Sequence, residues 1–308
     1  MCYIFMNIFF ITLPIFLIIA AGWLMRKLNI VKESWMSVLN GFAYYVSLPA
    51  LIIASFWDIN FLDKKSLEII LWSLSAVFIF SLIVFLLLSF LKINKNLKAA
   101  IFLSATVGNT VYMGFPLVNM AFGENYLSQG VLIGVIYLVV PLLISIFAIR
   151  HWHNNDHSLS GQLKDFFKNP LMISVFAGIV LSFINFDIAG INSVKKAFAM
   201  VGATASPVAL FTLGEFLYGK FLKKDLGLVF SVSFLKLVLF PLAVAFAPLY
   251  FFNRIEFEIL TLLSSMPVAV TTFVIAEKFH LDKDLVGNSI FVSTIFSFLV
   301  IPLILFLI

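Results

Sequence analysis

Residues 108–116 read GNTVYMGFP, and this stretch decides the fold. It lies near the middle of an apolar run, residues 99–123, that carries no charge. Glycine favours local unwinding, and Pro116 cannot donate a backbone hydrogen bond to residue 112. In a bilayer, the backbone groups that such a break exposes are tolerated only where protein or a water-filled cavity satisfies them. We therefore expect an interrupted membrane helix over 97–123, with polar side chains at the break.

The composition places the chain in a membrane. Of its 308 residues, 62% are hydrophobic and 11% are charged, whereas a soluble domain carries roughly 25% charged residues. A spanning helix needs about 20 apolar residues, so we expect an all-α integral membrane protein with ten transmembrane helices. The expected spans are 4–25, 35–57, 67–91, 97–123, 127–149, 170–186, 194–219, 226–250, 257–277 and 285–307. The net charge of +5 comes almost entirely from residues between these runs, so it does not indicate a nucleic-acid partner.

The second half of the chain repeats the proline pattern of the first half. The ordered pairs are Pro14 and Pro170, Pro49 and Pro207, Pro116 and Pro267, and Pro141 and Pro302. Because a buried proline breaks a helix, we expect paired helix breaks, although proline is also common in membrane helices generally. Two homologous units of five spans must have opposite orientations. We therefore expect two inverted five-helix repeats, at 1–150 and 169–308, joined by a cytoplasmic loop over 151–168.

The expected span 257–277 mirrors the first broken helix. Pro267 lies at its centre, and the hydroxyl side chains around it are Ser264, Ser265, Thr271 and Thr272. Two interrupted helices that meet near the bilayer midplane present half-helix N-termini, whose partial positive charge suits a carboxylate. The alternative is a pair of kinked structural helices whose hydroxyls bond to their own backbone. We favour a binding site, because both breaks fall at matching positions in the two halves.

Several motifs resemble the auxin efflux carrier family, which includes plant auxin exporters and bacterial permeases for malate and malonate. They are Asn109-Thr110-x-x-x-Gly114-x-Pro116-Leu117-Val118 followed by Phe122-Gly123-Glu124, Tyr44-Tyr45-Val46-Ser47-Leu48-Pro49-Ala50-Leu51, Leu235-Lys236-Leu237 leading to Pro241, Met266-Pro267, and Ala276-Glu277-Lys278. The resemblance covers essentially the whole chain. It implies that interrupted helices 4 and 9 cross, as in the bile-acid symporter architecture, with a scaffold part and a moving transport part. It places the substrate near the crossing, although Thr271-Thr272 stands where many relatives have asparagine.

These patterns define a set of candidate site residues. The expected substrate-binding residues are Asn109, Thr110, Tyr112, Gly114, Pro116, Asn119, Lys236, Pro267, Thr271 and Thr272, and the expected helix-break or gating residues are Pro49, Gly108 and Pro207. Packing between helices explains Asn119 equally well. The cluster His151, His153 and His157 matches no strong metal signature, so we expect neither a metal nor a cofactor. No histidine or aspartate pair stands within the apolar spans, so we expect a transporter and not an enzyme.

Two charged residues lie deeper than the connections. Lys236 is about ten residues into the span 226–250, and Glu215 precedes the end of the span 194–219. A lone charge at mid-bilayer costs roughly 2.5–3.5 kcal/mol on insertion scales, which favours a partner or a cavity. The alternatives for Lys236 are an ion pair with Glu215, attraction of an anionic substrate, and extension of its long stem to the surface. Glu215 is also a candidate for proton coupling.

The expected function is transport of a small organic anion by alternating access, with a mono- or dicarboxylate such as malate or malonate as the candidate by resemblance. The broken segments hold no Asp or Glu, which favours potential-driven efflux, exchange or proton-linked transport. The alternative is a sodium-coupled organic anion symporter of the same fold, with a cation cage around Thr110, Ser265 and Thr271.

The basic residues predict the orientation. Fourteen of the twenty Lys and Arg residues lie in the odd-numbered connections and five in the even-numbered ones. Because basic connections stay in the cytoplasm, we expect a multi-pass protein of a plasma or inner membrane with both termini outside the cytoplasm. The expected partners are the organic anion and the lipid bilayer, and a homodimer is a further assembly that the sequence leaves open.

Overall fold

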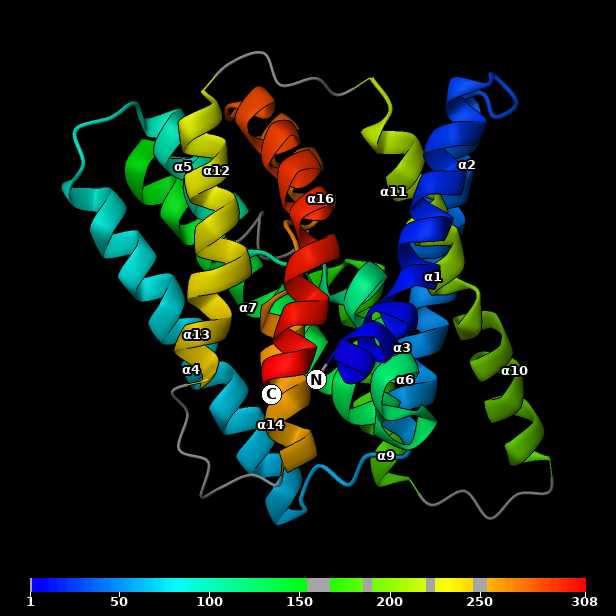
Figure 1. Ribbon diagram of the computed structural model, residues 1–308. Coiled ribbons are helices and arrows are strands. Elements are labelled where there is room, and N and C mark those ends of the chain that lie inside the picture. Colours follow the sequence, from blue (N-terminus) through cyan, green and yellow to red (C-terminus); the bar gives the residue numbers. More distant parts are fainter. Residues whose placement is uncertain (1, 154–166, 185–189, 220–224, 246–253) are drawn as a thin grey trace.

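The computed structural model describes residues 2–153, 167–184, 190–219, 225–245 and 254–308 (Figure 1). Its helices and helical turns are α1 (Cys2–Lys27), α2 (Glu33–Phe42), η1 (Ala43–Ser47), α3 (Leu48–Trp57), α4 (Lys64–Phe90), α5 (Lys95–Thr106), η2 (Thr110–Gly114), α6 (Phe115–Phe122), η3 (Glu124–Tyr126), α7 (Leu127–His153), α9 (Pro170–Phe183), α10 (Ile191–Ala203), α11 (Ala205–Leu217), α12 (Leu226–Phe234), η4 (Leu235–Leu239), α13 (Phe240–Ala245), α14 (Arg254–Ser264), α15 (Thr271–Lys278) and α16 (Lys283–Leu307). Within these described residues, extended pairing is limited to one isolated bridge between Gly108 and Val268.

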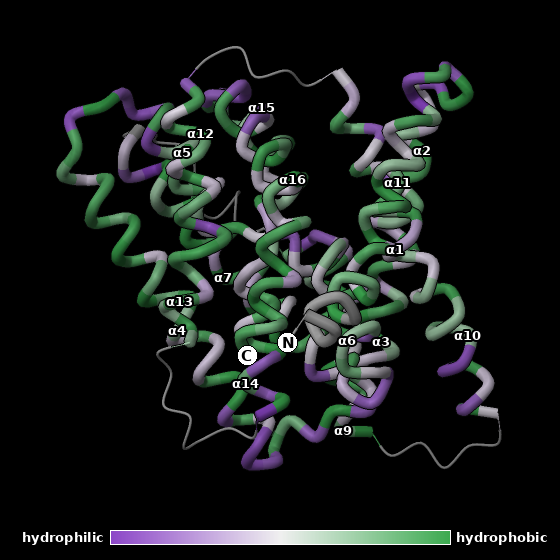
Figure 2. The backbone as a smooth tube through the Cα atoms, viewed as in Figure 1, coloured by the Kyte–Doolittle hydropathy of each residue, from purple (hydrophilic) through white to green (hydrophobic). Residues whose placement is uncertain are grey.

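Apolar helices of membrane-spanning length dominate the fold. Among the described residues, seven helical stretches are long and apolar enough to cross a membrane: Ile8–Lys27, Ser34–Trp57, Lys64–Phe90, Glu124–Trp152, Ile191–Leu217, Leu226–Ala245 and Lys283–Leu307. Thr110–Phe122 and Pro170–Phe183 are apolar but shorter. Hydrophilic residues gather toward the helix ends and connections (Figure 2). The all-α membrane class is therefore confirmed, whereas the count of ten spans and the inverted repeat stay predictions.

The helices form two bundles that meet at the centre of the molecule (Figure 1). In the first bundle α1 packs against α11, and α3 packs against α9 and α10. In the second bundle α7 packs against α4 and α5, α16 against α12 and α5, and α14 against α13. The bundles touch where α1 meets α16 and α6, and where α3 meets α7. The turn η2 contacts both α7 and α11, so the first helix break lies between the bundles.

Two glycines allow α1 and α11 to touch backbone to backbone. A Cβ atom on Gly22 would lie 2.0 Å from the carbonyl oxygen of Phe211, and one on Gly214 would lie 1.9 Å from the carbonyl oxygen of Ile19. Small residues at such crossings let membrane helices approach closely, and van der Waals packing then drives their association. The first bundle therefore depends on two residues that have no side chain.

Only some of the paired prolines interrupt their helices. Pro14, Pro141 and Pro302 lie inside the unbroken helices α1, α7 and α16. The prediction that each paired proline breaks its helix is therefore wrong for these three. A membrane helix tolerates the missing hydrogen bond when neighbouring groups and small local adjustments satisfy the freed carbonyl.

Three other prolines follow π-helical turns. Pro49, Pro116 and Pro241 are the second residues of α3, α6 and α13, directly after η1, η2 and η4. A π-turn widens the helix locally, and such turns often occur at functional sites. Of the remaining predicted break residues, Pro207 is the third residue of α11, just after the boundary between α10 and α11.

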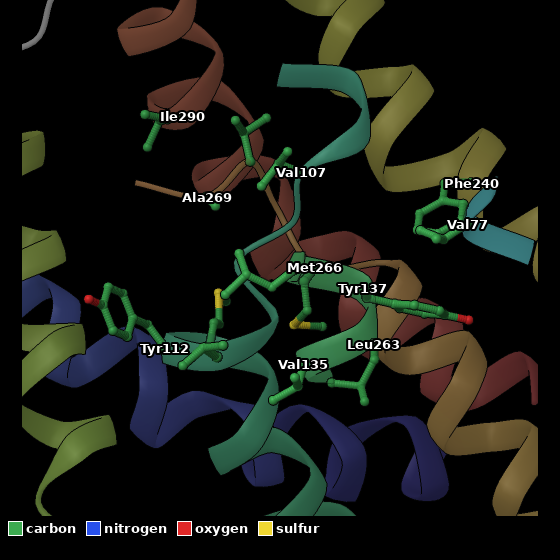
Figure 3. Close-up of a cluster of buried hydrophobic side chains, with 14 of the residues drawn as sticks. Val77, Val107, Tyr112, Val135, Tyr137, Phe240, Leu263, Met266, Ala269 and Ile290 are labelled. Carbon is green, nitrogen blue, oxygen red and sulfur yellow. The ribbon is translucent and has the colours of Figure 1, made fainter. Parts of the chain in front are cut away.

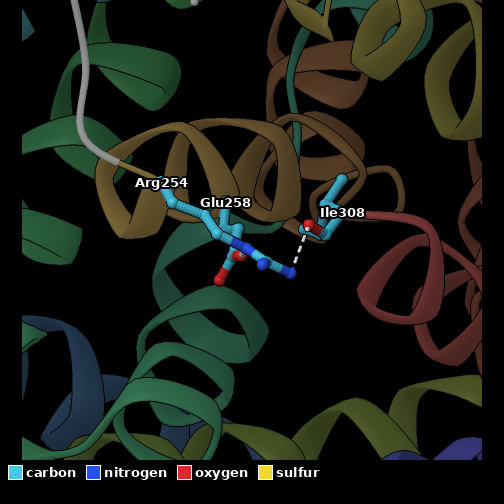
Figure 4. Close-up of polar contacts among 3 residues, drawn as sticks. All are labelled: Arg254, Glu258 and Ile308. Carbon is cyan, nitrogen blue, oxygen red and sulfur yellow. Dashed lines mark hydrogen bonds and ion pairs between the residues drawn. The ribbon is translucent and has the colours of Figure 1, made fainter.

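Arg254 ties the start of α14 to the last residue of the chain. Its Nε lies 2.7 Å from a carboxylate oxygen of Glu258, and its Nη2 donates to the backbone oxygen of Ile308 at 3.4 Å (Figure 4). The beginning of α14 and the end of α16 therefore lie at the same end of the second bundle. The connections 154–166 and 220–224, which carry His157 and part of the basic charge, lie outside the described residues, so the orientation stays a prediction.

Candidate functional site

Two unwound segments cross at the junction of the bundles. α5 ends at Thr106, and helical structure resumes at Thr110. α14 ends at Ser264, and α15 begins at Thr271. Pro267 disfavours helical geometry at the residue before it, so α14 ends ahead of it. Both interruptions lie within the two spans for which the sequence predicted them.

The crossed segments satisfy part of one another's backbone. The Asn109 N–H donates to the carbonyl oxygen of Pro267 at 2.7 Å. The Ala269 N–H donates to the carbonyl oxygen of Val107 at 3.2 Å. Since buried backbone groups must find partners, these two bonds replace some of the helical bonds lost at the breaks. The two interrupted helices are thereby hydrogen-bonded to each other at their unwound segments.

α16 and a hydrophobic cluster hold the crossing in place. The Val268 N–H donates to the hydroxyl oxygen of Ser293, on α16, at 3.0 Å. Val107, Met266 and Ala269 are buried and gather at the crossing (Figure 3). Non-helical backbone at membrane depth is tolerated where protein buries it, and these contacts meet that requirement.

A small cavity adjoins the crossing. Its volume is about 10 Å³, and its lining residues are Leu48, Gly108, Asn109, Val111, Tyr112, Leu138, Leu171, Ala269 and Thr271. The side-chain nitrogen of Asn109 and the hydroxyl oxygen of Thr271 are shielded from solvent and have no hydrogen-bond partner in the part of the chain that the structure describes. Buried polar groups are normally hydrogen-bonded, so two such groups beside one cavity indicate a place for a polar guest. In its present size the cavity holds about one water molecule.

A larger pocket opens between the bundles, near the ends of α3 and α6. Its volume is about 580 Å³, within the range of about 300–1,000 Å³ that is usual for small-molecule sites. The polar and charged residues that line it are Ser55, Asp58, Asn119, Glu124, Ser128 and Ser206. Pro116 and Pro207 line it as well. The structure therefore divides the predicted site residues between this pocket and the small cavity.

The carboxylates that line the larger pocket are not among the site residues predicted from the sequence. Asp58 caps the end of α3 and Glu124 begins η3, so both look like ordinary charges of a connection. Asp58 forms an ion pair with Lys195 of α10. Their position in the sequence could have indicated them: Asp58 follows the short helix whose second residue is Pro49, and Glu124 follows the short helix whose second residue is Pro116.

Other predicted residues contribute to packing at the crossing. The Thr110 hydroxyl donates to the carbonyl oxygen of Gly134 at 2.8 Å, which fastens η2 to α7. The Thr272 hydroxyl donates at 2.6 Å to the carbonyl oxygen three residues earlier. Gly114 packs against the side chain of Leu263 on α14. The Thr272 hydroxyl therefore bonds to its own local backbone, as expected for a kinked structural helix.

Lys236 lies at the crossing and is fully buried. Its Nζ donates to the carbonyl oxygen of Ser264, the last residue of α14, at 2.7 Å. Nζ also lies 4.8 Å from the centre of the Phe240 ring. The side chain therefore does not extend to the surface, and among the described residues no ion pair joins it to Glu215.

Glu215 lies in the first bundle, on α11. It is 4% exposed and lines neither the small cavity nor the larger pocket. Its helix, α11, contacts η2. Its role in coupling stays a prediction.

Comparisons with known proteins agree with the motifs. A sequence profile of the family described as membrane transport protein matches residues 7–305. The chain is 27% identical to an uncharacterized transporter of Methanocaldococcus jannaschii, over 95% of this chain and 96% of that protein. It is 25% identical to a Rhizobium meliloti protein named "Putative malonate transporter", over 97% of this chain and 95% of that protein. It is 24% identical to the lysosomal cholesterol signaling protein of Mus musculus, where the match covers 92% of this chain and 36% of the mouse protein.

Proposed function

This chain belongs to the membrane transport protein family, and we propose that it carries a small organic anion across the membrane by alternating access. It is a multi-pass membrane transporter, and the expected kinship with auxin efflux carriers is confirmed by the family match. The substrate class that we propose is a mono- or dicarboxylate such as malate or malonate. The Rhizobium meliloti relative that is named for malonate transport supports this class.

The observation that carries the proposal is the pair of unpartnered donors at the crossing. The Asn109 side-chain nitrogen and the Thr271 hydroxyl lie beside the starts of η2 and α15. Both groups can donate hydrogen bonds, and a half-helix N-terminus adds partial positive charge. Leaving a buried donor unsatisfied costs about 1–3 kcal/mol, so a carboxylate that bonds to both would remove two such costs.

Alternating access would proceed by movement of one bundle against the other. Leu48 of α3 and Leu171 of α9 close the small cavity from the first bundle, whereas Asn109 and Tyr112 belong to the break between the bundles, which a hydrogen bond fastens to α7 of the second bundle. We propose that an anion enters through the larger pocket and that a shift between the bundles enlarges the small cavity. Ten spans in two inverted repeats would relate the outward-facing and inward-facing states by a pseudo-two-fold rotation axis in the membrane plane. With the basic connections in the cytoplasm, the larger pocket would face outside.

The membrane potential favours export or exchange of an anion. Moving one negative charge into a cell against 100 mV costs about 2.3 kcal/mol. The two broken segments carry no carboxylate that could bind a coupling ion, whereas Asp58 and Glu124 line the larger pocket. We therefore propose potential-driven efflux, exchange or proton-linked transport.

Counterflow of labelled malonate and malate in proteoliposomes tests the proposal. We expect exchange without sodium, and we expect Asn109→Ala to reduce it about 10–100-fold, since a hydrogen bond to a charged group contributes about 1.5–3 kcal/mol. Asn288→Ala is the matched control, because Asn288 is a buried amide of α16 that lines neither cavity. Exchange that survives in Asn109→Ala/Thr271→Val would place the site elsewhere. Absence of exchange with every carboxylate tested would remove the substrate class.

A further inference from the structure

The breaks bring the negative ends of two helices to one place. α5 ends at Thr106, two residues before Gly108, and α14 ends at Ser264. The carboxyl end of a helix carries a partial negative charge, and its last carbonyl groups have no helical partner. The last residues of the two helices, Thr106 and Ser264, are both buried inside the protein, so a positive charge there would be stabilised by the helix dipoles.

The hydrogen-bond partners of the last carbonyl groups of α14 show which group supplies a positive charge at this helix end. The carbonyl oxygens of residues 261–263 accept hydrogen bonds from backbone or hydroxyl groups of residues 264–266. The carbonyl oxygen of Ser264 instead accepts from Nζ of Lys236 at 2.7 Å. An ammonium group, supplied from another helix, therefore completes the end of α14.

The surroundings of this ammonium group are suited to a cation. The Phe240 ring centre lies 4.8 Å from Nζ, within the distance of a cation–π contact. A Cβ atom on Gly108 would lie 2.8 Å from Cε and 2.9 Å from Nζ of Lys236. The glycine thus leaves the space into which the ammonium group fits, next to the unwound backbone of the first break.

We infer that the ammonium group of Lys236 is a tethered cation that takes the place of a coupling sodium ion at the crossing. In transporters with broken helices, unwound carbonyl groups and half-helix carboxyl ends coordinate the coupling cation. Here the carboxyl end of α14, the neighbouring break and an aromatic face surround a lysine nitrogen instead. This inference rests on the proposed function, since only a carrier has a coupling site. A cation bonded to the chain is present throughout the transport cycle, so the carrier needs no sodium gradient.

Removal of the tethered cation tests the inference. Lys236→Ala leaves a space beside the Ser264 carbonyl that a small free cation can fill, whereas Lys236→Met fills most of that space with an uncharged chain. Lys98→Ala is the matched control, because Lys98 also donates to a backbone oxygen, that of Ser89 at 3.3 Å, but lies outside the crossing. The readout is thermal unfolding of the purified protein without any carboxylate, in sodium, methylammonium or choline chloride at equal ionic strength.

We expect Lys236→Ala to unfold at a lower temperature than wild type in choline, and to regain stability as sodium or methylammonium is added, because a ligand of the folded state alone stabilises it. Wild type, Lys236→Met and Lys98→Ala should respond equally to all three salts. Carboxylate exchange by Lys236→Ala should be lost in choline and partly restored by the same two cations.

Two results would overturn the inference. One is a Lys236→Ala protein that behaves identically in all three salts, which would make Lys236 a hydrogen-bond donor only. The other is a wild-type protein whose stability or exchange requires sodium. If Lys236→Ala does not fold, Lys236→Ser replaces it, and failure of both in every salt also counts against the inference. Because the thermal measurement uses no carboxylate, it stands even if the proposed substrate class fails.

Discussion

Gly22→Ala tests whether the first bundle depends on direct backbone contact between α1 and α11. The new Cβ atom would lie 2.0 Å from the carbonyl oxygen of Phe211 and 2.9 Å from its carbonyl carbon. Both are backbone atoms of a helix, so no side-chain rotation can relieve the overlap. To bring the closest pair to an ordinary contact of 3.4 Å, the helices must move about 1.4 Å apart.

The separation has a cost that can be estimated. Overpacking a close interface lowers the free energy of unfolding by about 1–3 kcal/mol. A gap of about 0.5–1 Å already forfeits about a quarter to a half of the dispersion attraction between facing atoms, so the loss extends along the whole crossing. The better helix propensity of alanine offsets up to about 1 kcal/mol. We therefore expect a net loss of about 1–2 kcal/mol, which corresponds to a fall in Tm of about 2–8 °C.

The assay is thermal unfolding of purified protein, followed by tryptophan fluorescence. Gly41→Ala is the control, because a Cβ atom at this position of α2 would meet no atom within 4 Å, and we expect its Tm to stay the same or rise slightly. In the double variant Gly22→Ala/Gly214→Ala, a single movement of α1 away from α11 relieves both overlaps. Its loss in free energy of unfolding should therefore be smaller than the sum of the losses in the two single variants. Equal Tm values for Gly22→Ala and Gly41→Ala would refute the reasoning.

Two further variants test the contacts that hold the broken helix. Ser293→Ala removes the acceptor of the Val268 N–H, so we expect the free energy of unfolding to fall by about 1–3 kcal/mol, measured as a lower Tm. Thr110→Val removes the 2.8 Å bond to the Gly134 carbonyl oxygen, and we expect a similar loss together with slower carboxylate exchange, because η2 is then less firmly held against α7.

Each of these variants has a matched control. Ser297→Ala removes a buried hydroxyl of α16 that donates only within its own helix, to Thr294 at 2.7 Å, and Thr212→Val does the same in α11, where the acceptor is Ala209 at 3.0 Å. Both controls should change Tm much less than the variants at the crossing. If a control variant lowers Tm as much as the crossing variant it is matched to, the hydroxyl bonds at the crossing contribute no more to stability than hydroxyl bonds within a single helix.

The fold class could be predicted from the sequence because it depends on local properties. Low charge and long apolar runs require a membrane, and a membrane requires helices whose backbone groups are paired within each segment. The breaks at Gly108 and Pro267 could be located for the same reason, since unwinding by glycine and the missing N–H of proline act on the chain around them. Local sequence could not predict whether Pro14, Pro141 and Pro302 break their helices. That depends on whether groups of neighbouring helices satisfy the freed carbonyl oxygen.

The candidate site was predicted as one group of residues, and the structure separates it. Asn109 and Thr271 line the small cavity at the crossing, whereas Pro116 and Asn119 line the larger pocket. Thr110, four residues after the end of α5 at Thr106, donates its hydroxyl hydrogen bond to the carbonyl oxygen of Gly134 on another helix. Position along a broken helix indicates depth in the bilayer, but the direction of each side chain depends on the local turn, which here is π-helical.

By itself, the sequence determined that this is an all-helical membrane protein of a transporter family, with two helices broken near residues 108 and 267. Tertiary structure alone decided which groups meet there. Lys236 could have paired with Glu215, reached the surface or faced a substrate, and the packing of α12, η4 and α13 against the crossing gave it the carbonyl oxygen of Ser264. The physical reason is that hydropathy and helix breaking act over a few neighbouring residues, whereas the partner of a buried charge is set by contacts between segments far apart in the chain.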